Sequence, residues 1–407
     1  MFASVAILVA PARSSLADLV VCCTTEPPSK GIDPVILMIF STTWVAVSSI
    51  VIVTTLLSAM PGTAWQCRIC DFPRAQILTI GAALLAGGFA LILAGQSLPG
   101  AWASLPLFAL LGLAVTIQTS WAIRLTPLVS VEIPPAPIRT GSHTKVPAEG
   151  TLRIVTANVD YTNRDPDRAL ELLIAQRPHV LAIVENTDDW TPRLEALADS
   201  FPWHVIEPRP DGRGVALLAR VPLRATQVEC LVSQDRPSIW GLAQVQGIDV
   251  GIGVLHPAPP GLPSRRGDRK DSTERDIELH VAAERVRSAV NKLPWIVTGD
   301  FNDVGWSRTT EHFKRISGLG DPRTGRGTFN TFPASWPLIR YPIDHVMLST
   351  ALRIVSLRRL PNIGSDHLPL LADVRLNTAP VWENADRQRK PESKLVYNAC
   401  SGETIAQ

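Results

Sequence analysis

Residues 295–302 of the chain read Trp-Ile-Val-Thr-Gly-Asp-Phe-Asn. Three apolar residues and a threonine followed by a glycine are typical of a short buried strand. A carboxylate, Asp300, and an amide, Asn302, follow it two positions apart, so both side chains can lie on one side of an extended segment. The stretch therefore predicts a strand that delivers polar groups to a site at its end.

The same arrangement recurs through the second half of the chain. Leu152–Asn158 ends in an amide, Val180–Glu185 in a carboxylate and Gly251–His256 in an imidazole. Residues 342–345 (Pro-Ile-Asp-His) open a strand with an acid, and residues 364–367 (Gly-Ser-Asp-His) place an acid beside an imidazole. One such residue is usually an ordinary loop residue, but six positions without a cysteine predict a shared site. Oxygen donors of this kind suit Mg²⁺ or Mn²⁺.

Short apolar runs alternate with helical patterns over roughly 225 residues, which predicts one α/β domain with its own core. In the last helical pattern, Ile277, Val281 and Val290 mark the expected apolar face. The expected strands are Leu152–Val159, His179–Val184, Gly214–Ala219, Ile248–Leu255, Trp295–Thr298, His345–Leu348 and Ala372–Leu376, and the expected helices are Ala169–Gln176, Trp190–Ser200 and Glu274–Asn291.

The first third of the chain is apolar. Residues 34–60 and 75–123 contain no charged residue, and Gln96–Gly100 interrupts the second stretch. A helix needs about 20 apolar residues to cross the hydrocarbon core of a bilayer. Three membrane spans are therefore predicted, near Pro34–Met60, Ile77–Ala94 and Ala101–Ile123. A buried helical hairpin is the alternative, but charge-free stretches of this length are rare in water-soluble folds.

The flanking segments have different compositions. Residues 1–33 are expected to be a poorly ordered lead, residues 124–150 a proline-rich, semi-rigid linker, and residues 377–407 a polar, disordered tail. Arg68 and Arg74 lie in the first loop and Arg124 follows the third span, so the positive-inside rule weakly favours a cytoplasmic side for that loop and for the domain.

The composition of the chain argues against several classes of protein. The chain carries 39 Lys and Arg against 37 Asp and Glu, a net charge of +2, which gives no global signature of nucleic-acid binding. Six cysteines in 407 residues do not form a disulfide framework. Cys67 and Cys70 have no second cysteine pair with which to build a zinc site.

Taken in order, residues 299–302, 343–345 and 364–367 resemble the motifs of the endonuclease/exonuclease/phosphatase superfamily. The resemblance covers about residues 152–376 and implies the DNase I-like fold, a four-layer α/β sandwich of two packed mixed sheets flanked by helices. Residues 151–376 would form this domain, behind a three-helix transmembrane anchor at residues 34–123. The anchor, including the stretch from Trp65 to Arg74, resembles a membrane-anchored bacterial branch, so a multi-pass position in a bacterial inner membrane is expected; that stretch has no assigned role.

The resemblance also implies roles around a divalent cation, Mg²⁺ or Mn²⁺. Glu185 would be the principal metal ligand, assisted by the amide of Asn158, and Asp366 would add a second carboxylate near the metal. Asp300 would orient or deprotonate the attacking water.

Further residues would act on the phosphate. Asn302 would hold a non-bridging oxygen, and His256 would bind the phosphate from the opposite side. His367 would act as an acid or hydrogen-bond donor, with Asp344 fixing its tautomer. Arg323 and Arg326, in a glycine-rich loop, are candidates to clamp the phosphate; His345 is expected to be structural and His179 to be a turn residue.

The expected function is hydrolysis of a phosphodiester or phosphomonoester by a membrane-anchored, divalent-metal-dependent enzyme. Its partners would be the lipid bilayer and a phosphoester substrate, which could be a nucleic acid, a lipid head group or a small phosphoester; no obligate protein partner is inferred. A lipid or small-molecule phosphoesterase stands as an alternative to a nuclease. A catalytically inactive, membrane-anchored binding module is the alternative from a different class.

Overall fold

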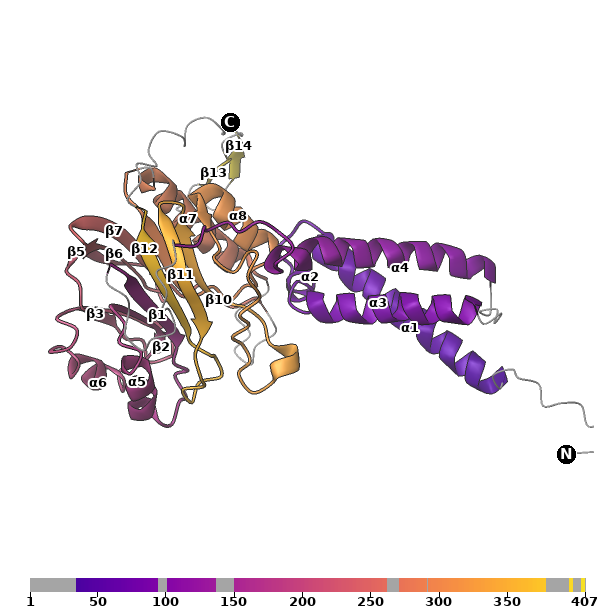
Figure 1. Ribbon diagram of the computed structural model, residues 1–407, viewed down its shortest axis with the longest axis horizontal. Helices are drawn as coiled ribbons and strands as arrows, with labels where there is room; N and C mark the ends of the chain where they lie inside the picture. Colours follow the sequence, from indigo (N-terminus) through magenta and orange to yellow (C-terminus); the bar gives the residue numbers. More distant parts are fainter. Residues whose placement is uncertain are drawn as a thin grey trace, which may run out of the picture.

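The computed structural model describes residues 34–93, 101–136, 150–261, 271–290 and 292–377, and two short strands at 395–397 and 404–406. Figure 1 shows two parts, an α/β domain and a bundle of long helices that projects from one side of it. The expectations for residues 1–33, for the linker beyond residue 136 and for most of the tail lie outside the described residues.

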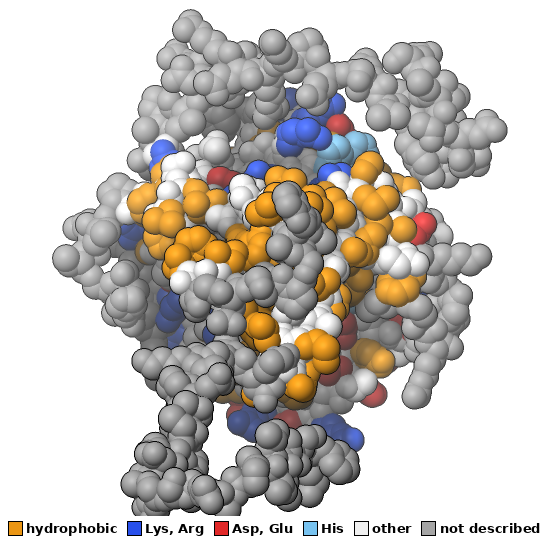
Figure 2. Space-filling view, turned by 90° about the vertical axis from the view of Figure 1, so that its right-hand side faces the viewer, with side chains coloured by type: hydrophobic (Ala, Val, Ile, Leu, Met, Phe, Trp, Pro, Cys, Tyr) orange, Lys and Arg blue, Asp and Glu red, His pale blue; other side chains and the backbone are white. Residues whose placement is uncertain are grey.

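Three helices form the projecting bundle: α1 (Pro34–Ala59), α3 (Arg74–Leu93) and α4 (Ala101–Ala122). All three are long and apolar enough to cross a membrane, and they coincide with the three stretches expected to span one. Figure 2, a view onto the side from which the bundle projects, shows hydrophobic side chains over the bundle and charged side chains around it. The short helix α2 (Trp65–Ile69) lies between α1 and α3, at the junction with the domain (Figure 1).

The segment after α4 is part of the domain, so the expectation of a linker is wrong for residues 124–136. Ile133 is fully buried in the domain's main core. The Ala136 N–H donates to the Ile354 carbonyl at 2.8 Å, and the Ile354 N–H donates to the Pro134 carbonyl at 3.1 Å. Glu132 accepts a hydrogen bond from the Lys314 ammonium at 2.7 Å. The prolines suggested a spacer, but Ile133 beside them packs into the core.

Two six-stranded mixed sheets make up the domain. Strands β1 and β2 are parallel in the first sheet, and β7 and β8 are parallel in the second. The first sheet has the order β11 (Leu352–Arg359), β12 (Leu370–Leu376), β1 (Leu152–Asn158), β2 (Val180–Asn186), β4 (Gly214–Ala219), β3 (Trp203–Glu207). The second has the order β5 (Leu223–Glu229), β6 (Ser238–Val245), β7 (Ile248–Leu255), β8 (Trp295–Asp300), β10 (Asp344–Ser349), β9 (Leu319–Gly320).

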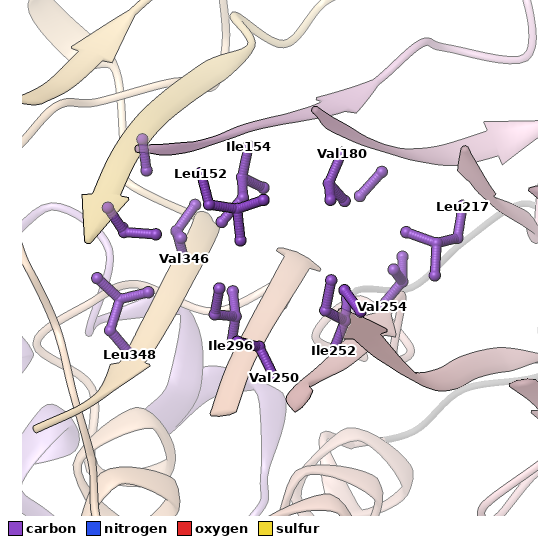
Figure 3. Close-up of a cluster of buried hydrophobic side chains, with 14 of the residues drawn as sticks. Leu152, Ile154, Val180, Leu217, Val250, Ile252, Val254, Ile296, Val346 and Leu348 are labelled. Carbon is purple, nitrogen blue, oxygen red and sulfur yellow. The ribbon is translucent and has the colours of Figure 1, made fainter. Parts of the chain in front are cut away.

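The sheets pack face to face around one apolar core. Figure 3 shows Ile154 and Val180 of the first sheet opposite Ile252 and Ile296 of the second. Alternate residues of the strands face outward, where α5 (Pro166–Ile174) and α6 (Thr191–Glu195) cover the first sheet and α7 (Thr273–Ala289) and α8 (Arg308–Ser317) cover the second. This is the expected four-layer sandwich, with the DNase I-like arrangement of layers.

The expected apolar face of α7 is wrong. Leu279, Ala282 and Val286 are the buried apolar residues of this helix, whereas Ile277 and Val281 are only half-buried. Those two side chains line a cavity that Trp121 and Arg124 border from the end of α4. Because α7 lies between the second sheet and the anchor, it carries apolar side chains on two faces, and the sequence pattern did not distinguish them.

Candidate active site

Four strand ends carry the polar side chains of the site. Asn158 ends β1, Glu185 lies near the end of β2, His256 follows β7 and Asp300 ends β8. Because β1 and β2, and β7 and β8, are parallel pairs in sheets that pack face to face, these ends meet. The Asn158 amide donates to Glu185 Oε1 at 2.9 Å and to Asp300 Oδ2 at 3.1 Å. His256 Nε2 lies 3.7 Å from Glu185 Oε1 and 4.0 Å from Asp300 Oδ2.

An acid–imidazole pair completes the group. Asp344 is the first residue of β10 and lies opposite Asp300 in the antiparallel register of β10 and β8. The His367 Nδ1 lies 2.8 Å from Asp344 Oδ2, and its Nε2 lies 3.7 Å from Asp300 Oδ2. The loop that carries His367 is held by Ser365, whose hydroxyl donates to the Asn158 carbonyl at 2.8 Å and accepts from the His367 N–H at 2.9 Å.

Backbone conformations with positive φ angles occur at these strand ends, and they set the directions of the side chains. Glu185 and Asn302 have positive φ angles of 66° and 52°, which cost of order 1–3 kcal/mol each in residues other than glycine. Gly299 has φ +133°, and a Cβ there would lie 2.0 Å from the Leu255 carbonyl oxygen. Only glycine fits before Asp300, because β7 and β8 approach so closely at this point.

Burial shapes the charges of the site. It raises the pKa of Asp300 to about 7 and also raises the pKa of Glu185, since a carboxylate loses its hydration in the interior. Burial alone would lower the pKa of His367, but the neighbouring charges of Asp344 and Asp300 outweigh it and raise this pKa to about 10. The geometry therefore favours an imidazolium at His367 and a carboxyl group at Asp300 that ionises near neutrality.

The donor set fits a divalent cation. Among the described residues, two groups could hold one, and the ligand atoms within each lie within 4.8 Å of one another: Glu185 with His256 and Asp300, and Asp300 with Asp344 and His367. The second group already contains the ion pair of Asp344 with His367, so the first is the better candidate. Its two desolvated carboxylates are the oxygen donors that Mg²⁺ and Mn²⁺ prefer, and a cation would relieve their mutual repulsion.

Two expected metal ligands occupy different positions. The Asn158 amide nitrogen points at both carboxylates, while its oxygen accepts from the Asp160 N–H at 3.0 Å. In this arrangement the Asn158 amide orients both Glu185 and Asp300. The side chain of Asp366 is half-exposed and lies 3.9 Å from His367 Nε2, outside both groups of ligands.

Arg326 does not belong to the site. Its guanidinium donates to the Pro322 carbonyl at 2.9 Å and to the Ile133 carbonyl at 2.6 Å, so it ties the segment after α4 to the domain. Arg323 is buried in an ion pair with Asp321, at 2.8 Å. The glycine-rich loop suggested a phosphate clamp, but it has a structural role. Its arginines donate hydrogen bonds to carbonyl groups of the domain and pair with a buried carboxylate.

Two further histidines, for which the sequence predicted no catalytic role, make hydrogen bonds within the domain. His345 is fully buried, with its Nε2 2.8 Å from the Asp303 carbonyl oxygen. His179 accepts the Arg153 N–H at 2.9 Å at the start of β2.

A cavity of about 760 Å³ opens over these side chains. Asn302 lines it, and its amide donates to the Pro257 carbonyl at 3.0 Å. Arg236 is buried in the wall and donates to the His256 carbonyl at 3.1 Å. Ile69, Phe72 and Pro73, from the stretch between α1 and α3, also line it. Lining residues that the sequence analysis did not identify include Tyr161, Asp211, Arg213, Arg236, Phe332 and Tyr341. Single loop residues of this kind follow no sequence pattern; only the stretch from Trp65 to Arg74 had been singled out.

Comparison with known proteins identifies one family. The profile of the Endonuclease/Exonuclease/phosphatase family matches residues 155–367. Similar solved structures include a humanized D. rerio TDP2, with a TM-score of 0.45 and 17% identity over 56% of this chain and 100% of that one. The human Nocturnin catalytic domain is similar with a TM-score of 0.43 and 20% identity, over 57% of this chain and 97% of that one. An endonuclease/exonuclease/phosphatase from Beutenbergia cavernae is similar with a TM-score of 0.43 and 19% identity, over 57% of this chain and 73% of that one. No curated protein sequence matches the chain.

Proposed function

The chain belongs to the endonuclease/exonuclease/phosphatase family, and from this premise we propose that it is a membrane-anchored hydrolase of phosphoester bonds that uses Mg²⁺ or Mn²⁺. The observation that carries the proposal is the position of Asp300 between two imidazoles. Its Oδ2 lies 3.7 Å from His367 Nε2 and 4.0 Å from His256 Nε2, at the floor of the cavity. Phosphoryl transfer needs a positioned water and donors for the phosphate oxygens, and this arrangement offers both.

Asp300 is the proposed general base. In the absence of a cation burial raises its pKa to about 7, and its carboxylate lies at the floor of the cavity, where it can accept a proton from a water. The attacking oxygen bonds to phosphorus while the bond from phosphorus to the leaving oxygen breaks. Asn158 holds the Asp300 carboxylate in place at 3.1 Å, so the base does not rotate away from the water.

His367 is the proposed acid or hydrogen-bond donor. Asp344 holds its Nδ1 proton, which leaves the protonated Nε2 directed at the cavity. His256 and Asn302 line the same cavity and are proposed to bind phosphate oxygens from the other side. A cation held by Glu185 and Asp300 would supply positive charge to the phosphate. The buried arginine, Arg236, adds a further positive charge to the wall of the cavity.

The three apolar helices are proposed to anchor the domain in a membrane as a multi-pass protein. The loop between α1 and α3 contacts the domain, since the Ser272 N–H donates to the Thr63 carbonyl at 2.8 Å. That loop and the domain would therefore lie on one side of the membrane. Arg68 and Arg74 in this segment favour the cytoplasmic side.

The test uses the full chain, purified in detergent, with bis(p-nitrophenyl) phosphate and p-nitrophenyl phosphate as diester and monoester probes. We expect turnover of at least one probe with Mg²⁺ or Mn²⁺, and its loss in EDTA. Asp300→Asn should lower kcat at least 100-fold, because an amide does not accept the proton of the water. A protein inert toward both probes with either metal would favour the binding module, and undiminished turnover in EDTA would contradict the metal requirement.

A further inference from the structure

The anchor forms one wall of the catalytic cavity. Ile69, Phe72 and Pro73, from the segment between α1 and α3, line the same 760 Å³ cavity as Glu185 and Asp300. This wall is apolar, in contrast to the polar floor at the strand ends. A substrate whose phosphate reaches Asp300 must therefore lie with another part of its structure against the anchor.

Buried ion pairs and hydrogen bonds hold this wall in place. Asp71 is fully buried and pairs with Arg68 at 3.1 Å and with Arg74. Its carbonyl accepts a hydrogen bond from the Trp306 indole, in the loop after β8, at 2.7 Å. The ion pairs fix the segment itself, and the Trp306 indole joins it to the domain, so the segment is held against the domain by buried polar contacts.

Phe72 continues this interface into the cavity. Its ring packs edge-on against that of Tyr341, with the centroids 5.5 Å apart. The ring of Phe332, which also lines the cavity, lies tilted against the imidazole of His367, with the centroids 4.8 Å apart. Aromatic side chains of one hydrophobic cluster therefore extend from the anchor to His367.

A loop at residues 332–341 connects this surface with the start of a membrane span. Phe332 and Tyr341 pair at the base of the loop, where the Phe332 N–H donates to the Tyr341 carbonyl at 3.0 Å. The tip contains the turn η2 (Pro337–Ile339). The side chains of Trp336 and Leu338 at the tip are 65% and 91% exposed.

The tip of the loop lies beside the first turn of α3. The Leu338 carbonyl accepts a hydrogen bond from the Gln76 amide at 3.0 Å, although 262 residues separate the two. Figure 1 shows the orange turn η2 on the side of the domain from which the helices project. Exposed tryptophan and leucine at the level where a span begins are typical of side chains that enter a membrane interface.

We propose that the loop at residues 332–341 seats the cavity on the bilayer surface and that the substrate is a phosphoester carried by a membrane lipid. The apolar part of the lipid lies against Ile69, Phe72 and Tyr341, while its phosphate reaches Asp300. This inference rests on the proposed function, since the reaction is the same hydrolysis: water adds to phosphorus, the phosphorus–oxygen ester bond breaks, and the leaving oxygen takes up a proton.

Competing substrates fit these features less well. A nucleic acid would require a basic track leading to the cavity. The wall toward the anchor is instead apolar, and the two arginines of the lining, Arg213 and Arg236, lie beside the carboxylates of Asp211 and Glu274. A small soluble phosphoester would make no use of Trp336 and Leu338, which would only expose apolar surface. Since the anchor places the cavity at the level of the bilayer surface, a lipid phosphate is the chemistry that uses all of these features together.

The first test locates the loop without reference to activity. A photoreactive benzophenone amino acid replaces Leu338 in the full chain, reconstituted in vesicles of phosphatidylethanolamine and phosphatidylglycerol. We expect cross-links to phospholipid. The matched control is Ile248, an exposed apolar residue that begins β7 at the end of that strand away from His256. Cross-linking at Leu338 no greater than at Ile248 would overturn the seating of the loop.

The second test measures substrate preference with matched synthetic esters. Hexadecyl and ethyl p-nitrophenyl phosphate form a diester pair, and hexadecyl and ethyl phosphate form a monoester pair, so that only the apolar chain differs. We expect the reconstituted protein to hydrolyse the hexadecyl ester of at least one pair with a kcat/KM at least tenfold above that of the ethyl ester. No preference for the long chain, in a protein that hydrolyses bis(p-nitrophenyl) phosphate or p-nitrophenyl phosphate, would overturn the lipid substrate.

Substitution of the tip separates the role of the loop from that of the site. The triple variant W336S/L338S/I339S changes only exposed side chains, so it should retain the wild-type rate on bis(p-nitrophenyl) phosphate or p-nitrophenyl phosphate. Its rate on the vesicle-borne hexadecyl ester should fall about tenfold. An unchanged rate on that ester would contradict the inference. Inactivity of the wild-type protein toward all of these compounds would instead contradict the proposed function.

Discussion

The Nδ1 of His367 lies 2.8 Å from the Oδ2 of Asp344, and both side chains are buried. Asp344 opens β10, whereas His367 lies in the loop before β12, a strand of the other sheet. The pair therefore joins the two sheets at the floor of the cavity. Because its geometry is that of an ion pair, the imidazole is held in one orientation and in its charged form.

Asp344→Asn should lower kcat about 100-fold with little change in KM, because it removes the charge that supports the imidazolium and leaves the groups that line the cavity in place. His367→Ala should cost at least as much, and the double variant little more than His367→Ala alone. Steady-state kinetics on bis(p-nitrophenyl) phosphate or p-nitrophenyl phosphate measure both effects. Asp167→Asn, in an exposed ion pair with Arg193, is the control and should leave kcat unchanged. Fully additive losses would contradict the pairing.

The same pair predicts the titration of His367 in the metal-free protein. Asp344 and Asp300 raise the pKa of His367 to about 10 against the opposing effect of burial. The imidazole should therefore remain protonated at pH 8 in the wild-type protein. In Asp344→Asn its pKa should fall, since the largest favourable charge is lost while the burial remains. Nitrogen chemical shifts of the labelled imidazole distinguish the two forms; a neutral imidazole at pH 8 in the wild-type protein would contradict the prediction.

Glu185→Gln should weaken the response to metal, because an amide offers a neutral oxygen to a dication where the wild-type protein offers a charged one. The Mg²⁺ concentration that gives half-maximal activity should rise at least tenfold. Isothermal calorimetry with Mn²⁺ measures the same loss without turnover. Glu195→Gln, on the exposed surface of α6, is the matched control and should bind metal as the wild-type protein does. Equal metal affinity in Glu185→Gln would remove Glu185 from the ligand set.

Glu278 should make the stability of the domain depend on pH. It is fully buried in α7, neither of its carboxyl oxygens has a hydrogen-bond partner among the described residues, and burial raises its pKa to about 8. The folded protein therefore binds a proton here that the unfolded chain releases above its ordinary pKa near 4.5. The free energy of unfolding should fall as the pH rises through this interval.

Glu278→Gln should remove this loss. At pH 5 its stability should match that of the wild-type protein to within about 1 kcal/mol, and at pH 8 it should exceed it by a few kcal/mol, on the order of the shift in pKa. Denaturant unfolding in detergent at the two pH values gives the comparison. Glu284→Gln, whose exposed side chain pairs with Arg287, should show no such difference. A pH-independent difference between Glu278→Gln and the wild-type protein would contradict the argument.

The segment after α4 predicts where the soluble domain begins. A fragment of residues 126–376 should unfold at a higher urea concentration than one of residues 151–376, because only the longer fragment retains Ile133 in the core. Within the longer fragment, Ile133→Ala should cost about 2–5 kcal/mol, the usual range for removing a large aliphatic side chain from a core. Leu128→Ala, at a position 81% exposed, is the control. Equal midpoints for the two fragments would show that residues 126–136 add nothing to the core.

Much of the architecture follows from local sequence. The charge-free stretches predicted the helices of the anchor, since the hydropathy of a span is a property of about 20 consecutive residues. The strands that end in Asn158 and Asp300 were predicted because short buried strands have continuous apolar runs. The helical face of α7 was predicted wrongly, because Ile277 and Val281 face the junction with the anchor and a local pattern does not distinguish between two neighbouring surfaces.

By itself, then, the sequence determined the three long apolar helices, the α/β domain and the polar residues at its strand ends, because each depends on a short run of neighbouring residues. Only the tertiary structure decided which of those residues meet. In the folded protein Asp344 contacts His367 and Phe72 lines the cavity, whereas Arg326 lies outside the cavity and donates to the carbonyl of Ile133. These contacts depend on how the two sheets and the anchor pack together. The residues in contact are separated by 20 to more than 200 positions in the sequence, so no local sequence pattern predicts them.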